Sequence, residues 1–583
     1  MKDRFKAGKI RLENLDEKIT LAGWVHSVRD HGGIIFVDLR DRSGITQVVF
    51  DNNCKDYEMA KSLRSEYVIS VHGTVRRRSP ETSNPELPTG EIELSASSLE
   101  ILNSSIAPVI EINGSGEISE YIKMEHRYLY LRRPSSNEML KKRSNFFREL
   151  RSYLDKHEFT EVDTPILTKS TPEGARDFLV PSRLNKGTFY ALPQSPQIFK
   201  QLLMVAGVER YFQLAKCFRD EDLRADRQPE FMQLDMELSF ATKEEITTLA
   251  GNMLREAAKK VFNIDIGEIS IMKYREAMDR YGSDKPDLRY GLEIKDLTPL
   301  VKESGFSIFK EASKSGFVRA INAKGSAEII SRKDIDEFTK SISVFGARGL
   351  AWIKVNEDGS CSSVITKFLG EKELKEIMEA MGAEPGDTIF FVADDYQVVC
   401  ESLGHLRGII AEKMDLIDKN IYRCLWVVDF PLFEWSKEDK KLTSMHNPFT
   451  LPSNYIEGES NLEKMVSESY DLVLNGSEIA GGGLRIYKAS LQKKVFEILG
   501  IDGENAEKQF GHLLGALRNG APPHGGIAFG VDRILSIFMD TPSLRDIIPF
   551  PKTQKGQCPL TAAPSGVSIS DLMDLGITVD KKD

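Results

Sequence analysis

FRDEDLRADRQPEF, residues 218–231, follows an apolar run, YFQLA, at residues 211–215 and leads into QLDME at residues 233–237. This charged segment brings Arg219, Glu221 and Arg227 close in sequence to Phe231. Arginine forks neutralise phosphate oxygens, a carboxylate can orient an adenine amino group, and an aromatic face stacks on the base. The segment therefore predicts a strand, loop and strand that hold ATP. The alternative is an ordinary charged hairpin, which does not need this combination of residues.

Two later segments fit the same ligand. GGIAFGVDRIL, residues 525–535, is a glycine-rich strand with Arg533 at the entry to an apolar helix, so that the backbone can approach a nucleotide. EIAGGGLR, residues 478–485, follows Asp471, and carboxylates such as Asp471 and Glu478 can hold Mg²⁺ across ATP phosphates. Taken singly, each is more simply a glycine-rich turn. Their order after residues 218–231 favours a nucleotide site.

Length and composition set the broad class. The 583 residues exceed one hydrophobic core and predict three or four domains, and 41% hydrophobic with 28% charged residues is typical of a soluble globular protein. No run of about eighteen apolar residues indicates a membrane span, and the N-terminus lacks the apolar core of a secretory signal. The six cysteines have no CxxC spacing, which argues against zinc and favours a reduced, cytoplasmic location.

The net charge of −10 does not exclude nucleic acid as a partner. Salt screening confines a charge's field to about 8–10 Å, so a local basic patch can contact phosphate on an acidic protein. The three consecutive arginines at residues 76–78 are one candidate patch, and a solvated strand end is an equally good interpretation of them.

Residues 1 to about 107 predict β-structure, because short β-branched runs alternate with turn signals. Five such strands suit a small Greek-key barrel of the OB type, which commonly binds single-stranded nucleic acid. Phe36 could stack on an unpaired base, with Arg29 and Gln47 as polar contacts, but periodicity alone favours Phe36 as barrel core. The predicted strands are residues 19–25, 34–39, 46–50, 67–71 and 91–94.

Helical signals begin after this barrel. Ser135 and Glu138 have capping-box spacing at the start of a predicted helix, and a strand ending at Pro165 follows. Residues 290–415 carry alternating helix and strand signals between the chemistry-bearing segments, which predicts an inserted α+β domain. The apolar residues that recur on one face of the first helix are Met139, Phe146, Leu150 and Tyr153.

These segments resemble the signature motifs of the class II aminoacyl-tRNA synthetases. Residues 218–237 resemble motif 2, residues 525–535 resemble motif 3, and residues 135–165 resemble motif 1, usually a dimer-interface element. TPEGARD at 171–177, QSPQIFKQ at 194–201 and MHNPFT at 445–450 look like the amino-acid pocket of the bacterial-type aspartyl-tRNA synthetases. The resemblance spans essentially the whole chain.

The resemblance implies an α+β multidomain fold: an N-terminal OB-type β-barrel and an antiparallel-sheet catalytic core with an inserted α+β domain. The implied parts are an OB-fold anticodon-binding domain at 1–107, a hinge at 108–135, the catalytic core with motifs 1 and 2 at 136–289, a GAD-like insertion at 290–415, and the rest of the core with motif 3 and a C-terminal extension at 416–583.

The implied reaction attaches L-aspartate to tRNA through an aspartyl-adenylate, at the expense of ATP. In the resemblance Arg219 bridges the aspartate carboxylate and the α-phosphate, and Arg533 with Mg²⁺ holds the outer phosphates. The resemblance implies Mg²⁺ with ATP, no zinc and no organic prosthetic group. The implied catalytic residues are Arg219, Arg533 and Glu478, and the implied metal ligands are Asp471 and Glu478. The implied ATP-binding residues are Arg219, Asp220, Glu221, Gln228, Phe231, Glu478, Gly530, Val531, Asp532 and Arg533.

An aspartate side chain is best recognised by two cations, because an amide would turn its NH₂ group toward donors. Lys200 and Arg485 fill these roles in the resemblance. Such a site rejects asparagine, since the wrong ligand leaves buried charge unpaired. The implied aspartate-binding residues are Glu173, Ser195, Gln197, Lys200, Arg219, Asp235, His446 and Arg485.

One motif departs from the family pattern. The chain has Asn447 after His446, where many relatives carry two consecutive histidines. His446 keeps the substrate-facing position, which predicts that activity survives, and leaves any role of a second histidine in doubt.

The tRNA specificity depends on a smaller signal. One bacterial subtype charges only tRNA-Asp and the other charges tRNA-Asp and tRNA-Asn. His31 resembles the relaxed subtype, and residues 79–85 lack the lysine associated with strictness. These two features imply an enzyme that charges both tRNAs. The class II resemblance also implies a homodimer, and we expect it in the cytoplasm without a membrane partner. The implied tRNA contacts are Arg29, His31, Phe36, Gln47, Arg78 and Glu81.

Several alternatives remain at this point. His31 is a plain loop residue if the enzyme is strictly specific for tRNA-Asp. Asparaginyl- and lysyl-tRNA synthetases share the layout, but a cationic pocket repels lysine and disfavours an amide. An asparagine synthetase shares the core but does not need the barrel. A non-catalytic tRNA-binding paralogue would tolerate the loss of Arg219, Glu478 or Arg533, all of which are present.

Overall fold

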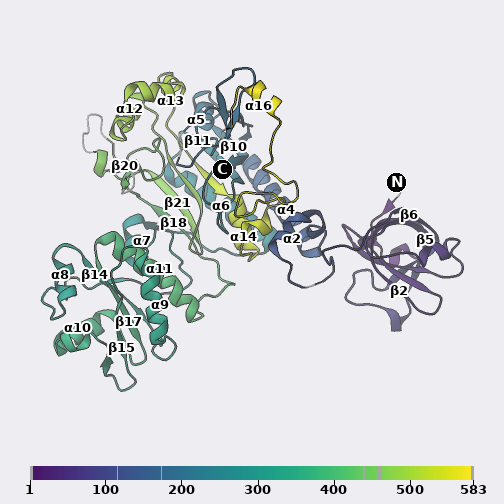
Figure 1. The fold of residues 1–583 in the computed structure, drawn as a ribbon, viewed down its shortest axis with the longest axis horizontal. Coiled ribbons are helices and arrows are strands. Elements are labelled where there is room, and N and C mark those ends of the chain that lie inside the picture. The colour runs from purple at the N-terminus through teal and green to yellow at the C-terminus, as the bar shows by residue number, and fades with distance from the viewer. Residues whose placement is uncertain (1–3, 115, 172–173, 437–439, 456–461, 580–583) are drawn as a thin grey trace. The chain divides into compact units, whose positions relative to one another are not determined.

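The computed structural model describes residues 4–114, 116–171, 174–436, 440–455 and 462–579. The chain divides into two compact units, one formed by Met1–Lys141 with Pro549–Gly566 and the other by Lys142–Ile548 with Val567–Asp583 (Figure 1). Among the described residues, no helix has the length and apolar character needed to cross a membrane.

The first unit contains a closed β-barrel, in which the strand order β1-β2-β3-β4-β6-β5 is completed by pairing of β2 with β5. Its interior is apolar and fully buried. The five long strands confirm the predicted OB-type barrel. The strands are β1 (Arg4–Phe5), β2 (Lys18–Asp30), β3 (Ile35–Asp41), β4 (Gly44–Phe50), β5 (Val68–Arg77) and β6 (Ile92–Asn103).

Phe36 does not belong to the barrel core. Side chains alternate between the two faces of a strand, and Ile35, Val37 and Leu39 of β3 take the inner face. Phe36 therefore lies on the other face, where it is half-buried. The interpretation of Phe36 as barrel core is wrong, because the pleat gives that position to its two neighbours.

The first unit also contains short helical turns, and α4 (Pro134–Lys156) continues from it into the second unit. The predicted apolar face of α4 is confirmed, since all four of its residues are buried. The predicted cap at Ser135 is wrong, because the helix already begins at Pro134, a residue suited to the first helical position. The short elements are η1 (Ala7–Lys9), η2 (Leu12–Asn14), α1 (Tyr57–Ala60), η3 (Pro80–Thr82), α2 (Glu120–Glu125) and α3 (Arg127–Tyr130).

A large sheet forms the centre of the second unit, with the order β12-β18-β21-β22-β23-β11-β10-β7. Its inner pairs are antiparallel, and only the edge strands β12 and β7 pair in parallel. α6 (Lys243–Phe262) packs against β23, and α14 (Val531–Phe538) packs against β11. The strands are β7 (Thr160–Glu161), β10 (Arg210–Phe218), β11 (Glu230–Ser239), β12 (Ser270–Lys273), β18 (Cys424–Val428), β21 (Ser469–Leu474), β22 (Ser477–Leu484) and β23 (His524–Gly530).

A smaller sheet lies in the segment predicted as an insertion, with helices on both faces (Figure 1). Phe390 and Val392 face α9 and α11, whereas Ile389 and Phe391 face α8 and α10. The elements are β13 (Lys295–Asp296), α8 (Ser307–Ser315), β14 (Phe317–Ala323), α9 (Arg332–Ser343), β15 (Ala351–Val355), β16 (Cys361–Ser362), η4 (Thr366–Phe368), α10 (Glu371–Met381), β17 (Thr388–Asp394) and α11 (Tyr396–Lys413).

The second unit has further short strands and helices, which come before, between and after the strands of the large sheet along the chain. They are β8 (Leu179–Pro181), β9 (Phe189–Ala191), α5 (Gln197–Val205), α7 (Tyr274–Tyr281), β19 (Phe433–Ser436), β20 (Lys441–Ser444), η5 (Leu462–Lys464), α12 (Ala489–Ile498), α13 (Gly503–Leu517), α15 (Leu544–Ile547) and α16 (Ile569–Leu575).

Candidate active site

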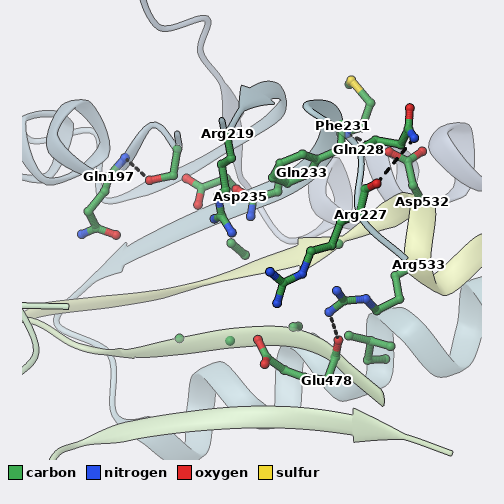
Figure 2. Close-up of a pocket in the computed structure, with 18 of the residues that line it drawn as sticks. Gln197, Arg219, Arg227, Gln228, Phe231, Gln233, Asp235, Glu478, Asp532 and Arg533 are labelled. Carbon is green, nitrogen blue, oxygen red and sulfur yellow. Dashed lines mark hydrogen bonds between the residues drawn. The ribbon is translucent and has the colours of Figure 1, made fainter. Parts of the chain in front are cut away.

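A pocket of about 420 Å³ lies over β11, β22 and β23 of the large sheet (Figure 2). It collects most of the site residues expected from sequence. Asp220, Val531 and Asp471 do not line it, and Glu173 lies outside the described residues. The expected residues that line the pocket are Ser195, Gln197, Lys200, Arg219, Glu221, Gln228, Phe231, Asp235, His446, Glu478, Arg485, Gly530, Asp532 and Arg533.

The hairpin of β10 and β11 supplies one wall of the pocket. Phe218 pairs with Glu230 next to the connecting loop, and the Arg219 amide donates to the Pro229 carbonyl at 2.9 Å. The Arg219 guanidinium lies 5.2 Å from the ring centroid of Phe231, a cation–π contact. Glu221 and Arg227 form an ion pair at 3.1 Å within the loop. These contacts join the charges of Arg219, Glu221 and Arg227 to neighbouring side chains of the hairpin and its loop.

The start of α14 supplies the opposite wall. Arg533 Nη1 donates to the Glu478 carbonyl at 2.7 Å, and Nη2 lies 3.7 Å from a carboxylate oxygen of Asp226, which also lines the pocket. Arg227 points into the same cavity (Figure 2). Asp532 is buried, and its two oxygens accept bonds from Arg143 and from the Met232 amide. Asp532 therefore ties α4 and β11 to α14.

Four buried charges form the floor of the pocket. Lys200 Nζ lies 2.7 Å from Asp235 Oδ1 and 3.1 Å from Glu237 Oε2. Arg485 Nε donates to Glu237 Oε1 at 3.0 Å. All four side chains are at most 3% exposed, so their two positive and two negative charges must balance one another.

Glu237 was missed by the sequence-based site prediction. The available signal was its spacing: Asp235 and Glu237 are two residues apart on β11, so they share one face of the strand. A Cβ on Gly526 of β23 would lie 2.0 Å from Glu237 Oε2. Glycine at 526 thus makes the room that the Glu237 carboxylate occupies.

The two carboxylates differ in their titration. Burial raises the pKa of Asp235 to about 6, because the loss of solvent outweighs the attraction of Lys200. Burial also acts on Glu237, but Arg485 and Lys200 together hold its pKa below the usual range. Asp235 Oδ2 is buried and has no hydrogen-bond partner among the described residues. Asp235 is therefore the carboxylate with an oxygen available to a ligand.

A neutral hydrogen-bond chain supports the same floor. His524 Nδ1 donates to the Pro522 carbonyl at 2.8 Å, which leaves Nε2 to accept from Gln201 at 3.2 Å. Gln201 in turn accepts from Gln197 at 3.1 Å. Burial lowers the pKa of His524, so the imidazole stays neutral. The chain fixes the orientation of Gln197 at the pocket surface.

Glu478 lines the side of the pocket, and Asp471, which does not line it, lies near Glu478 across Gly481. A Cβ on Gly481 would lie 2.9 Å from Asp471 Oδ1 and 3.5 Å from Glu478 Oε1. Burial and the neighbouring Asp471 raise the pKa of Glu478. Carboxylates that repel one another are stabilised by a shared cation, and Mg²⁺ bound with substrate phosphates commonly uses one or two of them. Glu478, which lines the pocket, therefore suits a Mg²⁺ ion that arrives with ATP, with Asp471 as the nearby second carboxylate.

His446 joins this side of the pocket. Its Nε2 lies 3.1 and 3.2 Å from the two oxygens of Asp471, and Phe430 meets its ring edge-on at 4.6 Å. Burial alone would lower the pKa of His446, but attraction by Asp471 raises it above the ordinary value. Asn447 closes the following turn, because its Oδ1 accepts from the Phe449 amide at 3.0 Å and the Thr450 hydroxyl at 3.2 Å. Asn447 thus has a structural task of its own.

A second groove, of about 630 Å³, lies on the barrel of the first unit. Five of the six expected tRNA contacts line it, and Glu81, in η3, does not. Phe36 and His31 meet edge-to-face with ring centroids 5.8 Å apart. The lining contacts expected from sequence are Arg29, His31, Phe36, Gln47 and Arg78.

Polar contacts hold the floor of this groove. Gln47 is buried and donates to Glu93 at 2.8 Å, and Arg76 donates to the same carboxylate at 2.8 Å. Arg29 pairs with Asp38 at 3.1 Å. The buried Nε of Arg78 has no hydrogen-bond partner in the described part of the chain. The groove combines a half-buried aromatic face with arginines, a pattern suited to unpaired bases.

Comparison with known proteins shows which family the chain is similar to. Residues 119–554 match the family model of tRNA synthetases class II (D, K and N), and residues 19–102 match that of the OB-fold nucleic acid binding domain. The chain is 50% identical to an aspartate–tRNA(Asp/Asn) ligase of Persephonella marina, over 98% of this chain and 97% of that protein. It is 52% identical to the protein of the same name from Halothermothrix orenii, over 98% of each chain.

A solved structure shares the fold. The asparaginyl-tRNA synthetase of Pyrococcus horikoshii, solved with asparaginyl-adenylate, superposes with a TM-score of 0.58 at 20% identity, covering 95% of this chain and 99% of that one. The family match over most of the chain and the relatives at half identity decide the assignment. The chain belongs to the class II tRNA synthetases of the D, K and N group and has their N-terminal OB-fold domain.

Proposed function

We propose that this protein activates L-aspartate with ATP and attaches it to tRNA-Asp and tRNA-Asn. The observation that carries the proposal is the buried group of Lys200, Asp235, Glu237 and Arg485 below a pocket with three arginines. The full-length relatives at about half identity carry the same two tRNAs in their names.

Lys200 and Asp235, which pair with each other in the structure, can each pair instead with a charged group of free aspartate. The substrate ammonium can take the open oxygen of Asp235, and the substrate side-chain carboxylate can take Lys200 and Arg485. Each buried charge then keeps an opposite partner, which is the condition for a stable buried ion pair. With asparagine, Asp235 would pair with the substrate ammonium, and Lys200 and Arg485 would have only Glu237 to share, one negative charge for two buried cations, so aspartate is the amino acid that fits.

ATP fits above this floor. Phe231 can stack on the face of adenine, and Glu221 and Gln228 can contact the polar edge of the base. Arg219 and Arg533 supply positive charge for the phosphates. Mg²⁺ bound with ATP would supply positive charge across the outer phosphates, and Asp471 and Glu478 are the residues that would hold it. Of the other expected ATP residues, Gly530 admits the nucleotide to the backbone, whereas Asp220, Val531 and Asp532 position their neighbours.

The chemistry follows from this arrangement. The aspartate α-carboxylate attacks the α-phosphorus in line and pyrophosphate leaves, with Arg219 placed to neutralise the charge of both groups. The terminal 3′-hydroxyl of the tRNA then attacks the adenylate carbonyl and AMP leaves. These side chains position the reactants and stabilise charge, and no protein nucleophile takes part.

Amino-acid-dependent ATP–pyrophosphate exchange tests this proposal. Wild-type protein with Mg²⁺ should catalyse exchange with aspartate. The kcat/KM of exchange should be at least about 10⁴-fold lower with asparagine, and lysine should support no exchange. Exchange that prefers asparagine or lysine would contradict the assignment, and absence of exchange with all three would indicate a non-catalytic paralogue.

Aspartate binding is expected to weaken below about pH 6. The raised pKa of Asp235 means that its carboxylate is charged above about pH 6 and protonated below, and the protonated form cannot pair with the substrate ammonium. The KM for aspartate in pyrophosphate exchange should rise about tenfold per pH unit below this value. The KM for ATP, followed on the same samples, serves as the control. A constant aspartate KM between about pH 5 and 8 would contradict this role.

We propose that the barrel groove reads the anticodon. Phe36→Ala is expected to lower kcat/KM for both tRNAs about tenfold or more, since base stacking contributes about 1–3 kcal/mol. Pyrophosphate exchange without tRNA should not change. His31→Leu is the matched variant for specificity, with a selective loss of tRNA-Asn charging. Equal charging by Phe36→Ala and wild type would remove the groove from tRNA recognition.

We further propose that the chain forms a homodimer in the cytoplasm. The dimer is supported by the resemblance of residues 135–165 to motif 1, and the location by the six cysteines, none of them in a disulfide. Sedimentation at micromolar concentration tests the dimer, and a monomer there would overturn it.

A further inference from the structure

We propose that the inserted domain positions the ATP-phosphate end of the active site by holding residues 283–289 against the turn that leads into Glu478, with Lys285 as the residue that meets the phosphates. The inference rests on the proposed function for its ligand. It assigns a role to Arg407 and Lys285, neither of which belongs to the site described above.

Arg407 of α11 anchors one end of this segment. It is 2% exposed, and its guanidinium donates to the carbonyls of Leu292 and Gly291, each at 2.9 Å, and of Asp287 at 3.4 Å. The rings of Tyr281 and Tyr290 flank it at 4.7 and 5.0 Å. The inserted domain thus binds the backbone of residues 287–292 through the buried guanidinium of Arg407. Loss of this cation would leave several carbonyls without a hydrogen-bond donor.

Two further contacts fix α11 and β14 to α7. A Cβ on Gly404 would lie 2.5 Å from the Gly282 carbonyl, so the two backbones touch where α7 ends. Asp279 of α7 accepts from Arg319 at 3.0 Å and from the Tyr396 hydroxyl at 2.8 Å. The chain just before residues 283–289 is therefore held by contacts with the inserted domain.

The far side of the segment packs on the catalytic sheet. Leu288 packs against the apolar cluster that contains Val473 of β21, as does Met445, the residue before His446. A Cβ on Gly476 would lie 3.1 Å from the Cβ of Asp287. Gly476 is in the turn between β21 and β22, two residues before Glu478. A shift of residues 283–289 would displace the turn between β21 and β22 and, with it, Glu478 near the start of β22.

Lys285 is the charged residue that the segment presents. It is exposed, and its ammonium makes no hydrogen bond or ion pair among the residues that the structure describes. Lys285 is two residues before Asp287, which lies against the turn that leads into Glu478. Its unpaired cation, together with Arg533, therefore suits the outer phosphates of ATP or the departing pyrophosphate.

Equilibrium binding of Mg²⁺–ATP to the full chain tests the role of Lys285. Lys285→Ala should weaken the Kd about tenfold, the loss of one charge-assisted contact, and Lys285→Arg should recover most of it. Lys302→Ala, an exposed lysine of the inserted segment, is the matched control and should bind as wild type. An unchanged Kd for Lys285→Ala would overturn the proposal.

Arg407→Lys tests the coupling, because one ammonium cannot replace the three carbonyl bonds of the guanidinium. The Kd for Mg²⁺–ATP and the KM for ATP should rise about fivefold or more while the KM for aspartate stays within about twofold. Lys413→Ala, on the same helix but paired with Asp334 in the inserted segment, should change neither. A lower melting temperature for Arg407→Lys with an unchanged Kd would overturn the coupling. A wild-type protein that binds Mg²⁺–ATP but catalyses no ATP–pyrophosphate exchange would contradict only the proposed function. The Kd values of the variants relative to wild type would still decide this inference.

Discussion

Arg485→Met is expected to lower kcat/KM for aspartate by about 10³-fold. The guanidinium is 3% exposed and is the fork that a substrate carboxylate would share with Lys200. Methionine keeps the length of the side chain but removes the charge, so the substrate carboxylate would be buried against one cation. Pyrophosphate exchange at varied aspartate concentration measures the effect, and Mg²⁺–ATP binding should remain.

The matched control for Arg485→Met is Arg518→Met. Arg518 pairs with Glu507 at 3.0 Å, but both side chains are about half exposed. Exposed pairs contribute little, so neither exchange nor stability should change measurably. A decrease in kcat/KM for aspartate of less than about tenfold in Arg485→Met would show that Arg485 does not recognise the substrate.

Glu237→Gln is expected to lower the free energy of unfolding by about 3–5 kcal/mol, because it leaves the buried cations Lys200 and Arg485 with Asp235 as their one remaining carboxylate. Glutamine has nearly the same shape, so the loss reports charge and not packing. The shift of the denaturation midpoint in urea measures it. Glu507→Gln, on the exposed pair, should move the midpoint by less than about 0.5 kcal/mol.

A double variant sharpens this prediction. Glu237→Gln with Arg485→Met removes one charge of each sign, so its destabilisation should be smaller than the sum of the single changes. Additive losses would show that Glu237 and Arg485 do not act as a pair. A Glu237→Gln protein as stable as wild type would contradict the account of the buried charges.

The sequence was most informative where a pattern has a fixed period or a fixed order. The barrel follows from short β-branched runs, and the apolar face of α4 from its helical spacing, because burial imposes both. Motif order brought Arg219 and Arg533, more than three hundred positions apart, into one prediction, and both line the same pocket.

Other features required coordinates. Glu237 looked like one more charge on a strand until Lys200, Arg485 and Gly526 were seen around it. Contacts between residues distant in the sequence leave no local signal, and the buried chain from His524 to Gln197 is a second case. Phe36 was misjudged because a short apolar run does not reveal which of its two faces is inside.

The central claim is that this chain gives aspartate to two tRNAs. Aminoacylation with labelled aspartate, using separate pure transcripts of tRNA-Asp and tRNA-Asn, tests it most directly. The account predicts that both transcripts accept aspartate. Charging of tRNA-Asp alone, with tRNA-Asn inert, would contradict it.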